Sequence, residues 1–404
     1  PLSVDCSTML NTSTMLNTPI YLDNHATTRV DPRVLDVMLP FFSEHYGNAA
    51  SINHRFGDDA RAAVETARDE VAKLVGANSE SVVFTSGATE ANNLAIKGLL
   101  APLLRRRAMA SNKAPHLIVN AAEHRAVLDP AKRLKRNGAA VTTIPVDEFG
   151  HVQSSSLVES LRPETQLVSV MLVNNEVGTV NPVAKLAAIC HEHGALLHCD
   201  AVQAAGRIPI DLSSLGADLL TLSAHKVYGP KGVGALIVRR DGDRIPLEAL
   251  IDGGGHEGQL RSGTLPVPLI VGFGEACRIA REEGTAESTR IAALRDELWE
   301  QLRRDLDGLH LNGHATERVC GNLNVSFEGV DGDVLMNAMT EIAVSSGSAC
   351  TSADPEPSHV LRAIGRSDQL TRASLRFGIG RFNTEDEIRF AADYVVAAVR
   401  RLRA

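Results

Sequence analysis

Two ionisable residues stand within a few positions of the end of short apolar runs of the sequence. Lys226 comes after Leu219–Leu222 and before a glycine-rich turn, and Asp200 follows Ala195–Cys199. A lysine beside a buried strand must be neutralised, paired or used covalently, and a Schiff base to an aldehyde cofactor is one such use. A carboxylate such as Asp200 could keep a pyridine nitrogen protonated, which strengthens the ring as an electron sink. Each residue also has a plainer role, as a structural lysine or a helix N-cap.

Two further groups occupy the same kind of position. His124 follows Leu117–Asn120, where an imidazole could stack on a cofactor ring and move protons near neutral pH. Ser86–Glu90 lies between the apolar run Val82–Thr85 and a helical pattern, so its backbone N–H groups could hold a phosphate, to which Thr89 would add a hydroxyl. The alternatives are a structural histidine and a helix cap. The segment has neither the lysine of a P-loop nor the glycine spacing of a dinucleotide-binding loop.

Cys350 lies in a segment of small residues, Val344–Ala353, which is typical of a flexible loop rather than a rigid core. A free thiol with a pKa of about 8.5 is only slightly ionised at neutral pH, so a reactive Cys350 needs a nearby base or cation, such as His124. An incidental loop cysteine is the alternative. No second cysteine or histidine stands at ligand spacing around Cys350, so the sequence predicts no intrinsic metal site.

Alternating strand and helix patterns must position these groups. The apolar strand candidates are Val82–Thr85, Leu117–Asn120, Val141–Ile144, Leu167–Val173, Ala195–Cys199 and Leu219–Leu222. Their alternation with helix-like segments predicts an α/β fold, with a mostly parallel sheet covered by helices on both faces. Gly232–Arg239 follows its predecessor too closely for a helical crossover and is expected to be antiparallel. Because ligands bind outside the carboxyl ends of parallel strands, we expect the polar groups to meet at one edge.

The chain is long enough for two domains. We expect residues 1–18, which contain the direct repeat STMLNT, to form a disordered tail. Residues 19–283 are expected to form a large cofactor-binding domain, although its first segment, 19–35, could pack on the second domain. Residues 284–404 are expected to form that second domain, a smaller α+β domain that carries the cysteine loop and ends in an amphipathic helix over Glu385–Arg403.

Composition narrows the class of protein. A net charge of −8 argues against nucleic-acid binding as the main function, and the apolar runs are too short to span a membrane. Six cysteines in 404 residues form no dense disulfide framework and no CxxC pair. We therefore expect a cytoplasmic enzyme with reduced thiols, no direct nucleic-acid partner and no membrane association.

The ordered set of motifs resembles the cysteine desulfurases, a group of the class V aminotransferases and fold-type I pyridoxal-phosphate (PLP) enzymes. The resemblance runs from Pro19 to the end of the chain, and the long serine-rich loop is similar to that of the iron–sulfur-assembly branch. Its marks are Leu22–Thr28 (LDNHATT), Phe84–Asn93 (FTSGATEANN), Glu123-His124, Asn174–Gly178 (NNEVG), His198–Gln203 (HCDAVQ), Ser223–Lys226 (SAHK), Arg261–Pro266 (RSGTLP) and the Cys350 loop.

The resemblance implies a role for each matching residue. Lys226 would form the Schiff base with PLP, Asp200 would face the pyridine nitrogen and Gln203 the phenolic oxygen. His124 would be the stacking acid–base group. The other cofactor-binding residues would be Ala88, the phosphate ligands Thr89, Ser223 and His225, and Thr264 from the neighbouring subunit of a homodimer. The residues that hold the substrate carboxylate would be Asn175 and Arg376.

The implied reaction takes sulfur from L-cysteine, gives L-alanine and leaves a persulfide on Cys350. Lys226 would remove the α-proton, and the Cys350 thiolate would attack the substrate sulfur. The sulfur would then pass to an iron–sulfur scaffold or another acceptor protein, and Cys350 could also be a cluster ligand shared with such a scaffold. The alternatives are a selenocysteine lyase or another class V PLP enzyme and, outside that class, a non-catalytic sulfur or cluster carrier.

Overall fold

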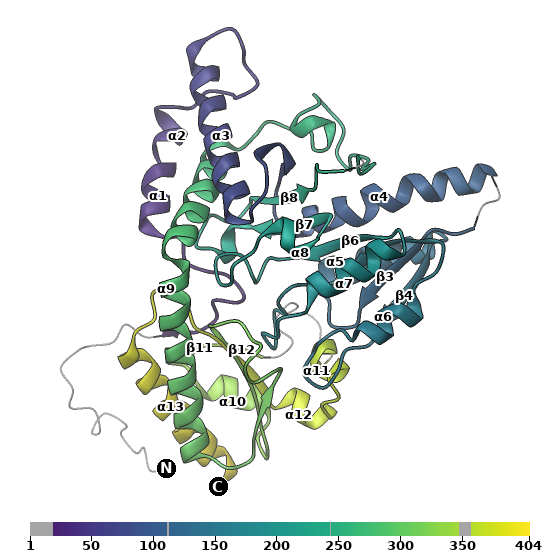
Figure 1. The fold of residues 1–404 in the computed structure, drawn as a ribbon. Helices are drawn as coiled ribbons and strands as arrows, with labels where there is room; N and C mark the ends of the chain where they lie inside the picture. Colours follow the sequence, from purple (N-terminus) through teal and green to yellow (C-terminus); the bar gives the residue numbers. More distant parts are fainter. Residues whose placement is uncertain (1–18, 111–112, 243, 347–356) are drawn as a thin grey trace.

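The chain forms a large sheet with helices on both sides, next to a smaller sheet with helices of its own (Figure 1). The computed structural model describes residues 19–110, 113–242, 244–346 and 357–404. The tail predicted at 1–18 and the predicted catalytic Cys350 lie outside the described residues. Within them, the predicted α/β fold with a mostly parallel main sheet is confirmed.

In the described part of the chain, the main sheet has seven strands in the order β2-β8-β7-β6-β5-β3-β4. They are β2 (Val82–Thr85), β3 (His116–Asn120), β4 (Ala140–Ile144), β5 (Thr165–Ser169), β6 (Leu196–Asp200), β7 (Leu219–Ser223) and β8 (Gly234–Val238). Neighbours among β3 to β7 pair in parallel, whereas β8 runs antiparallel to both β7 and β2. The antiparallel strand predicted within 232–239 is therefore confirmed.

Helices cover both faces of this sheet (Figure 1). They are α3 (Arg55–Leu74), α4 (Ala88–Ala110), α5 (Arg125–Arg136), α6 (Ser154–Ser160), α7 (Val183–Glu192), α8 (Leu212–Leu215) and α9 (Val267–Asp305), with α1 (Pro32–Met38) and α2 (Pro40–Ser43) beside α9. Neighbouring strand residues alternate between the faces: Leu219 packs in the core with α4 and α5, and Leu220 in the core with α3, α7 and α9. Burial on both faces explains the continuous apolar strands. No helix in the described ranges is long and apolar enough to cross a membrane.

The second sheet has four antiparallel strands among the described residues, in the order β12-β13-β10-β9. They are β9 (Leu309–Asn312), β10 (Asn322–Phe327), β12 (Ser345–Ser346) and β13 (Ser374–Gly378). Beside them lie α10 (Gly332–Ala338), α11 (His359–Ala363), α12 (Asp368–Arg372) and α13 (Glu385–Arg403), the last with the predicted bounds. β1 (Ile20–Tyr21) pairs in parallel with β11 (Ile342–Ala343), so the start of the described chain contacts its C-terminal part. Short 3-10 turns are η2 (Ser79–Ser81), η3 (Ala224–Lys226) and η4 (Glu257–Gln259).

Two predicted boundaries differ from the structure. The sequence predicts one strand over Leu167–Val173, but β5 ends at Ser169. Beyond that point the Met171 N–H donates to the Glu123 carboxyl group at 2.6 Å, and the Met171 carbonyl accepts from the Asn181 side chain at 3.0 Å. The Val170 and Leu172 N–H groups still donate to the β6 carbonyls of His198 and Asp200, each at 3.0 Å, so side chains replace strand partners only on the other side. The domain boundary predicted between 283 and 284 falls inside α9, which is continuous, so the division into two domains stays a prediction.

Candidate active site

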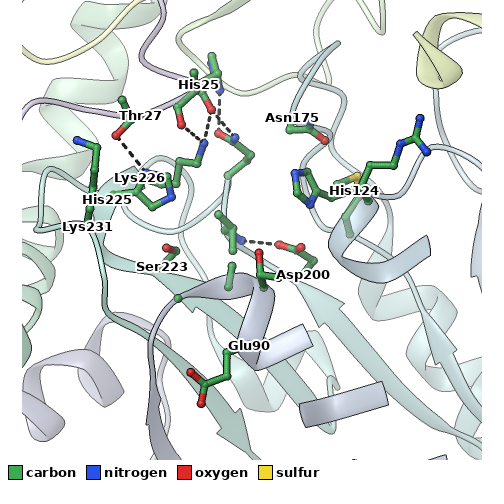
Figure 2. Close-up of a pocket in the computed structure, with 18 of the residues that line it drawn as sticks. His25, Thr27, Glu90, His124, Asn175, Asp200, Ser223, His225, Lys226 and Lys231 are labelled. Atoms are coloured by element: carbon green, nitrogen blue, oxygen red, sulfur yellow. Dashed lines mark hydrogen bonds between the residues drawn. The ribbon is translucent and has the colours of Figure 1, made fainter. Parts of the chain in front are cut away.

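A cavity of about 700 Å³ lies where the carboxyl ends of β6 and β7 reach the edge of the main sheet (Figure 2). Ten of the predicted site residues line it, namely Ala88, Thr89, His124, Asn175, Asp200, Gln203, Ser223, His225, Lys226 and Arg376. Thr264 is described but does not line this cavity, and Cys350 lies outside the described residues. The structure therefore brings most of the predicted residues together, while their individual roles stay predictions.

Lys226 reaches the cavity from the turn that follows β7. Two residues later, Tyr228 has a positive φ of 65°, which is unfavourable for a bulky side chain. Surrounding contacts hold this conformation, because the Tyr228 hydroxyl accepts from the Arg381 N–H at 2.6 Å and the Arg381 guanidinium lies 4.2 Å from the ring centre. The Lys226 amine donates to the backbone carbonyls of His25 and Ala26, the latter at 2.6 Å. The turn and these carbonyls together fix the amine at the cavity wall.

Asp200 is the last residue of β6 and is only 5% exposed. Its Oδ2 accepts a hydrogen bond from the Asn92 side chain at 2.8 Å, and its Oδ1 accepts one from the Val202 N–H at 3.1 Å. The second contact lies in the turn that follows β6, where no helix of the described chain begins, so Asp200 is not the helix N-cap that the sequence allows. Asp200 also lines the cavity, so these hydrogen bonds and the position needed for a cofactor contact occur together.

His124 lies at the start of α5, on the side of the cavity opposite His225 (Figure 2). Its Nδ1 accepts a hydrogen bond from the Ala126 N–H at 3.0 Å, so the side chain caps the helix. Burial lowers the pKa of His124, and the charge of Asp200 only partly opposes this shift. The ring is therefore mainly neutral near pH 7 and carries its proton on Nε2. Such a ring can exchange a proton with a ligand only at Nε2.

The start of α4 and the end of β7 form a further part of the cavity wall. Gly87 has a φ of 147°, a value that favours glycine, where the chain turns from β2 into α4. The first N–H groups of an α-helix, here those of Ala88 and Thr89, have no partner within the helix and can bind an anion. Ser223 and His225 line the same part. Burial is the main cause that lowers the pKa of His225 to about 4, so its ring is neutral.

Arg376 is 3% exposed and joins two distant segments. Its guanidinium donates to the Asp23 carboxylate at 2.9 Å and to the Asn175 carbonyl at 2.8 Å. The Arg376 Nε and the Asn175 Oδ1 are buried and have no hydrogen-bond partner among the described residues. Because buried polar atoms in proteins nearly always have a partner, these two atoms are suited to contacts with a ligand. A guanidinium group is also the natural partner of a carboxylate.

His25, Thr27 and Lys231 also line the cavity, although the sequence gives none of them a separate role. The His25 Nδ1 lies 2.8 Å from the Gln203 Oε1, and the Gln203 Nε2 donates to the His25 carbonyl at 2.9 Å. The Thr27 hydroxyl lies 3.1 Å from the His225 Nδ1. His25 and Thr27 belong to the LDNHATT motif, and Lys231 to the glycine-rich turn that leads to β8, so these motifs were the available signals.

Comparison with known proteins identifies the family. The aminotransferase class-V model matches residues 20–390. The chain belongs to this family. It is 52% identical over 385 residues to a protein of Anaeromyxobacter dehalogenans (strain 2CP-C) named cysteine desulfurase IscS, a match that covers 95% of this chain and 93% of that protein. The predicted family is therefore confirmed.

Solved structures agree with this assignment. A structure described as a NifS-like protein aligns with a TM-score of 0.85 and 37% identity, covering 94% of this chain and 98% of that chain. A second structure, described as SspA in complex with cysteine, aligns with a TM-score of 0.79 and 35% identity. This match covers 90% of this chain and 100% of that chain.

Class V aminotransferases are PLP enzymes, and the residues of the cavity fit such a group. Lys226 offers an amine that an aldehyde can take up, and Asp200 offers a carboxylate for a ring nitrogen. The unpartnered backbone donors at the start of α4 suit a phosphate. The buried Oδ1 of Asn175 has no hydrogen-bond partner in the described part of the chain, and Asn175 lines the same cavity, as expected of a wall that contacts a ligand.

Proposed function

We propose that this protein is a cysteine desulfurase, which takes sulfur from L-cysteine, releases L-alanine and holds the sulfur as a persulfide on Cys350. The observation that carries the proposal is the convergence of Lys226, Asp200 and Arg376 on one cavity. This convergence occurs in a chain that is 52% identical to a named cysteine desulfurase. Those three groups can hold an aldehyde cofactor, its ring nitrogen and a substrate carboxylate, respectively.

Side chains from several strand ends would hold the cofactor. The residues that would hold PLP are Lys226 through a covalent bond, Asp200 at the ring nitrogen, His124 against the ring, Gln203 at the phenolic oxygen, and Ala88, Thr89, Ser223 and His225 at the phosphate. When bound, PLP supplies an electron sink for the bond electrons released at the substrate α-carbon. The Gln203 Nε2 donates one proton to the His25 carbonyl, which leaves its second N–H for the phenolic oxygen.

Arg376 would hold the substrate carboxylate, with the Asn175 side chain beside it. Lys226 would take the α-proton at its Nζ once the substrate amine has displaced it from the cofactor. The carbonyls of His25 and Ala26, which already accept hydrogen bonds from this amine, would stabilise the ammonium form that results. The neutral ring of His124 would exchange a proton at Nε2.

Cys350 would accept the sulfur. A bond forms between the Cys350 thiolate and the substrate sulfur while the carbon–sulfur bond of the substrate breaks, and the electron pair of that bond stays with the carbon fragment. That fragment takes up protons and leaves as alanine. Cys350 lies outside the described residues, so its assignment rests on its serine-rich motif and on the family.

An assay of alanine and sulfide released from L-cysteine, in the presence of a thiol and beside an absorption spectrum, tests the proposal. Lys226→Ala should lose both the visible absorbance of bound PLP and all turnover. Cys350→Ser should keep the absorbance but stop sulfide release, because only the sulfur acceptor is removed. Cys320→Ser, at another cysteine, serves as the matched control and should turn over normally. A wild-type protein that forms no alanine would exclude the proposed function, and normal turnover of Cys350→Ser would exclude this acceptor.

We further propose a homodimer in which Thr264 completes the phosphate site of the second subunit. Thr264 does not line the cavity of its own chain, which supports this arrangement. The sulfur acceptor would be an iron–sulfur scaffold or another cytoplasmic sulfur-accepting protein, as the branch of the family suggests.

A further inference from the structure

The phosphate end of the cavity is built from uncharged donors. Ser223 offers a hydroxyl, and Ala88 and Thr89 offer backbone N–H groups. His225 offers a neutral ring, because its pKa is lowered to about 4. The start of α4 adds the equivalent of about half a positive charge. A phosphate monoester carries about −1.5 to −2 charges at pH 7, so these groups leave most of its charge unbalanced.

Among the described residues, four cationic side chains line the cavity. Two of them, Lys226 and Arg376, have places in the proposed function at the cofactor aldehyde and the substrate carboxylate. A third, Arg125, directly follows His124, which lies on the side of the cavity away from the phosphate end (Figure 2). Lys231 is the fourth, and it has no place in the proposed function.

Lys231 lies close to the phosphate end. Figure 2 shows it on the same side of the cavity as His225 and Ser223. The charge of Lys231 is one of those that lower the pKa of His225, so Lys231 lies near His225. Lys231 is exposed and makes no hydrogen bond or ion pair with the described residues. By contrast, Arg261 near the start of α4 is already paired with Glu90 at 2.9 Å.

We propose that Lys231 supplies the counter-charge for the phosphate group of PLP, in addition to the residues matched by the family motifs. The proposal rests on the proposed function, because it requires PLP in this cavity. The turn that carries Lys231 is anchored, since the Ala224 N–H donates to the Val233 carbonyl at 3.2 Å and the Gly229 N–H to the Ala224 carbonyl at 2.9 Å. The flexible stem of Lys231 can therefore move its ammonium group while the backbone of the turn stays fixed.

Binding of PLP and of pyridoxal, which lacks the phosphate, to PLP-free protein tests this role. Lys231→Met should weaken PLP binding about ten-fold, because one charge-assisted hydrogen bond is lost. The same variant should bind pyridoxal as tightly as the wild type does. Lys231→Arg keeps the charge and should restore most of the affinity for PLP. Added salt should shrink the difference between Lys231→Met and the wild type, because ions screen an exposed charge.

Lys185→Met is the matched control, since Lys185 is exposed on α7 and does not line this cavity. It should bind PLP like the wild type, and melting curves of the PLP-free variants should show that all of them are folded. The role of Lys231 is excluded if Lys231→Met binds PLP normally, or if it loses PLP and pyridoxal to the same extent. A wild-type protein that binds neither compound would instead exclude the proposed function as well.

Discussion

Glu176 is a buried carboxyl group that contacts the C-terminal part of the chain. The Ser358 hydroxyl donates a hydrogen bond to its carboxylate, and the side chains of Asn322 and Asn324 donate to its backbone carbonyl, each at 3.1 Å. Burial raises the pKa of Glu176 to about 7 from its ordinary value of 4.5, although Ser358 and the charge of Arg376 oppose the shift. Its charge state therefore changes near neutral pH.

The raised pKa of Glu176 predicts how the stability of the protein depends on pH. The folded form binds a proton more tightly than the unfolded form, so the stability from this group is fully present below pH 4.5 and is lost as pH rises through about 7. Glu176→Gln, whose carbonyl can still accept from Ser358, should remove this loss. Its free energy of unfolding relative to the wild type should rise by at most about 3 kcal/mol over that range.

Unfolding by denaturant at several pH values, for the wild type and Glu176→Gln, measures this difference. The exposed Glu159 on α6 offers the matched control, because Glu159→Gln should follow the pH profile of the wild type. Parallel profiles of Glu176→Gln and the wild type would contradict the raised pKa.

Single residues differ in how well the sequence predicts their place. Lys226 and Asp200 follow apolar strands, and a parallel sheet brings such strand ends to one edge, so their meeting in one cavity follows from topology. His25 could not be placed in this way. It reaches the cavity through contacts with Gln203, 178 residues away, and no periodicity or capping pattern encodes such a contact. The same holds for the ion pair between Asp23 and Arg376.

At the scale of elements, the turn from β2 into α4 is held close to β8. A Cβ at Gly234 would lie 2.6 Å from the Leu222 carbonyl oxygen and 2.8 Å from the Cα of Gly87. We predict that Gly234→Ala costs about 1–3 kcal/mol of stability by overpacking. It should also weaken PLP binding, because it displaces the turn that presents the first N–H groups of α4. Melting curves and PLP titrations measure the two effects.

Gly194→Ala separates these two effects. Gly194 has a positive φ of 73°, and a Cβ there would meet no atom within 4 Å. Its substitution should therefore cost about 1–2 kcal/mol of backbone strain and leave PLP affinity unchanged. Normal PLP affinity of Gly234→Ala would show that the phosphate end does not depend on this close approach.

The sequence predicts strands and helices best where one physical signal is sufficient. Burial on both faces makes β2, β6 and β7 mostly apolar, and an amphipathic pattern gives α13 its bounds, Glu385–Arg403. The signal fails at Leu167–Val173, because Val170–Val173 are equally apolar but follow the end of β5. There the strand ends through side-chain contacts of Glu123 and Asn181, which come from distant segments.

At the scale of the whole molecule, the cavity combines segments from almost the full length of the described chain, from His25 to Arg376. Thr264 remains outside it, and the proposed homodimer gives a reason. In a symmetric dimer, a residue outside its own cavity can enter that of the second subunit. Two variants of this chain, each defective in one residue, can show whether Thr264 serves its own cavity or that of the second subunit.

Lys226→Ala and Thr264→Val subunits, mixed and allowed to exchange, should recover desulfurase activity. In each mixed dimer, the chain with an intact Lys226 receives an intact Thr264 from its neighbour, so one complete site forms. Random exchange of equal amounts should make about a quarter of all sites complete, because half of the dimers are mixed and each has one such site. If Thr264 serves its own chain, every site lacks one of the two residues, and the mixture will be no more active than the average of the separate variants. Mass spectrometry of the intact dimers, with one variant isotopically labelled, shows whether exchange has occurred and makes a negative result decisive.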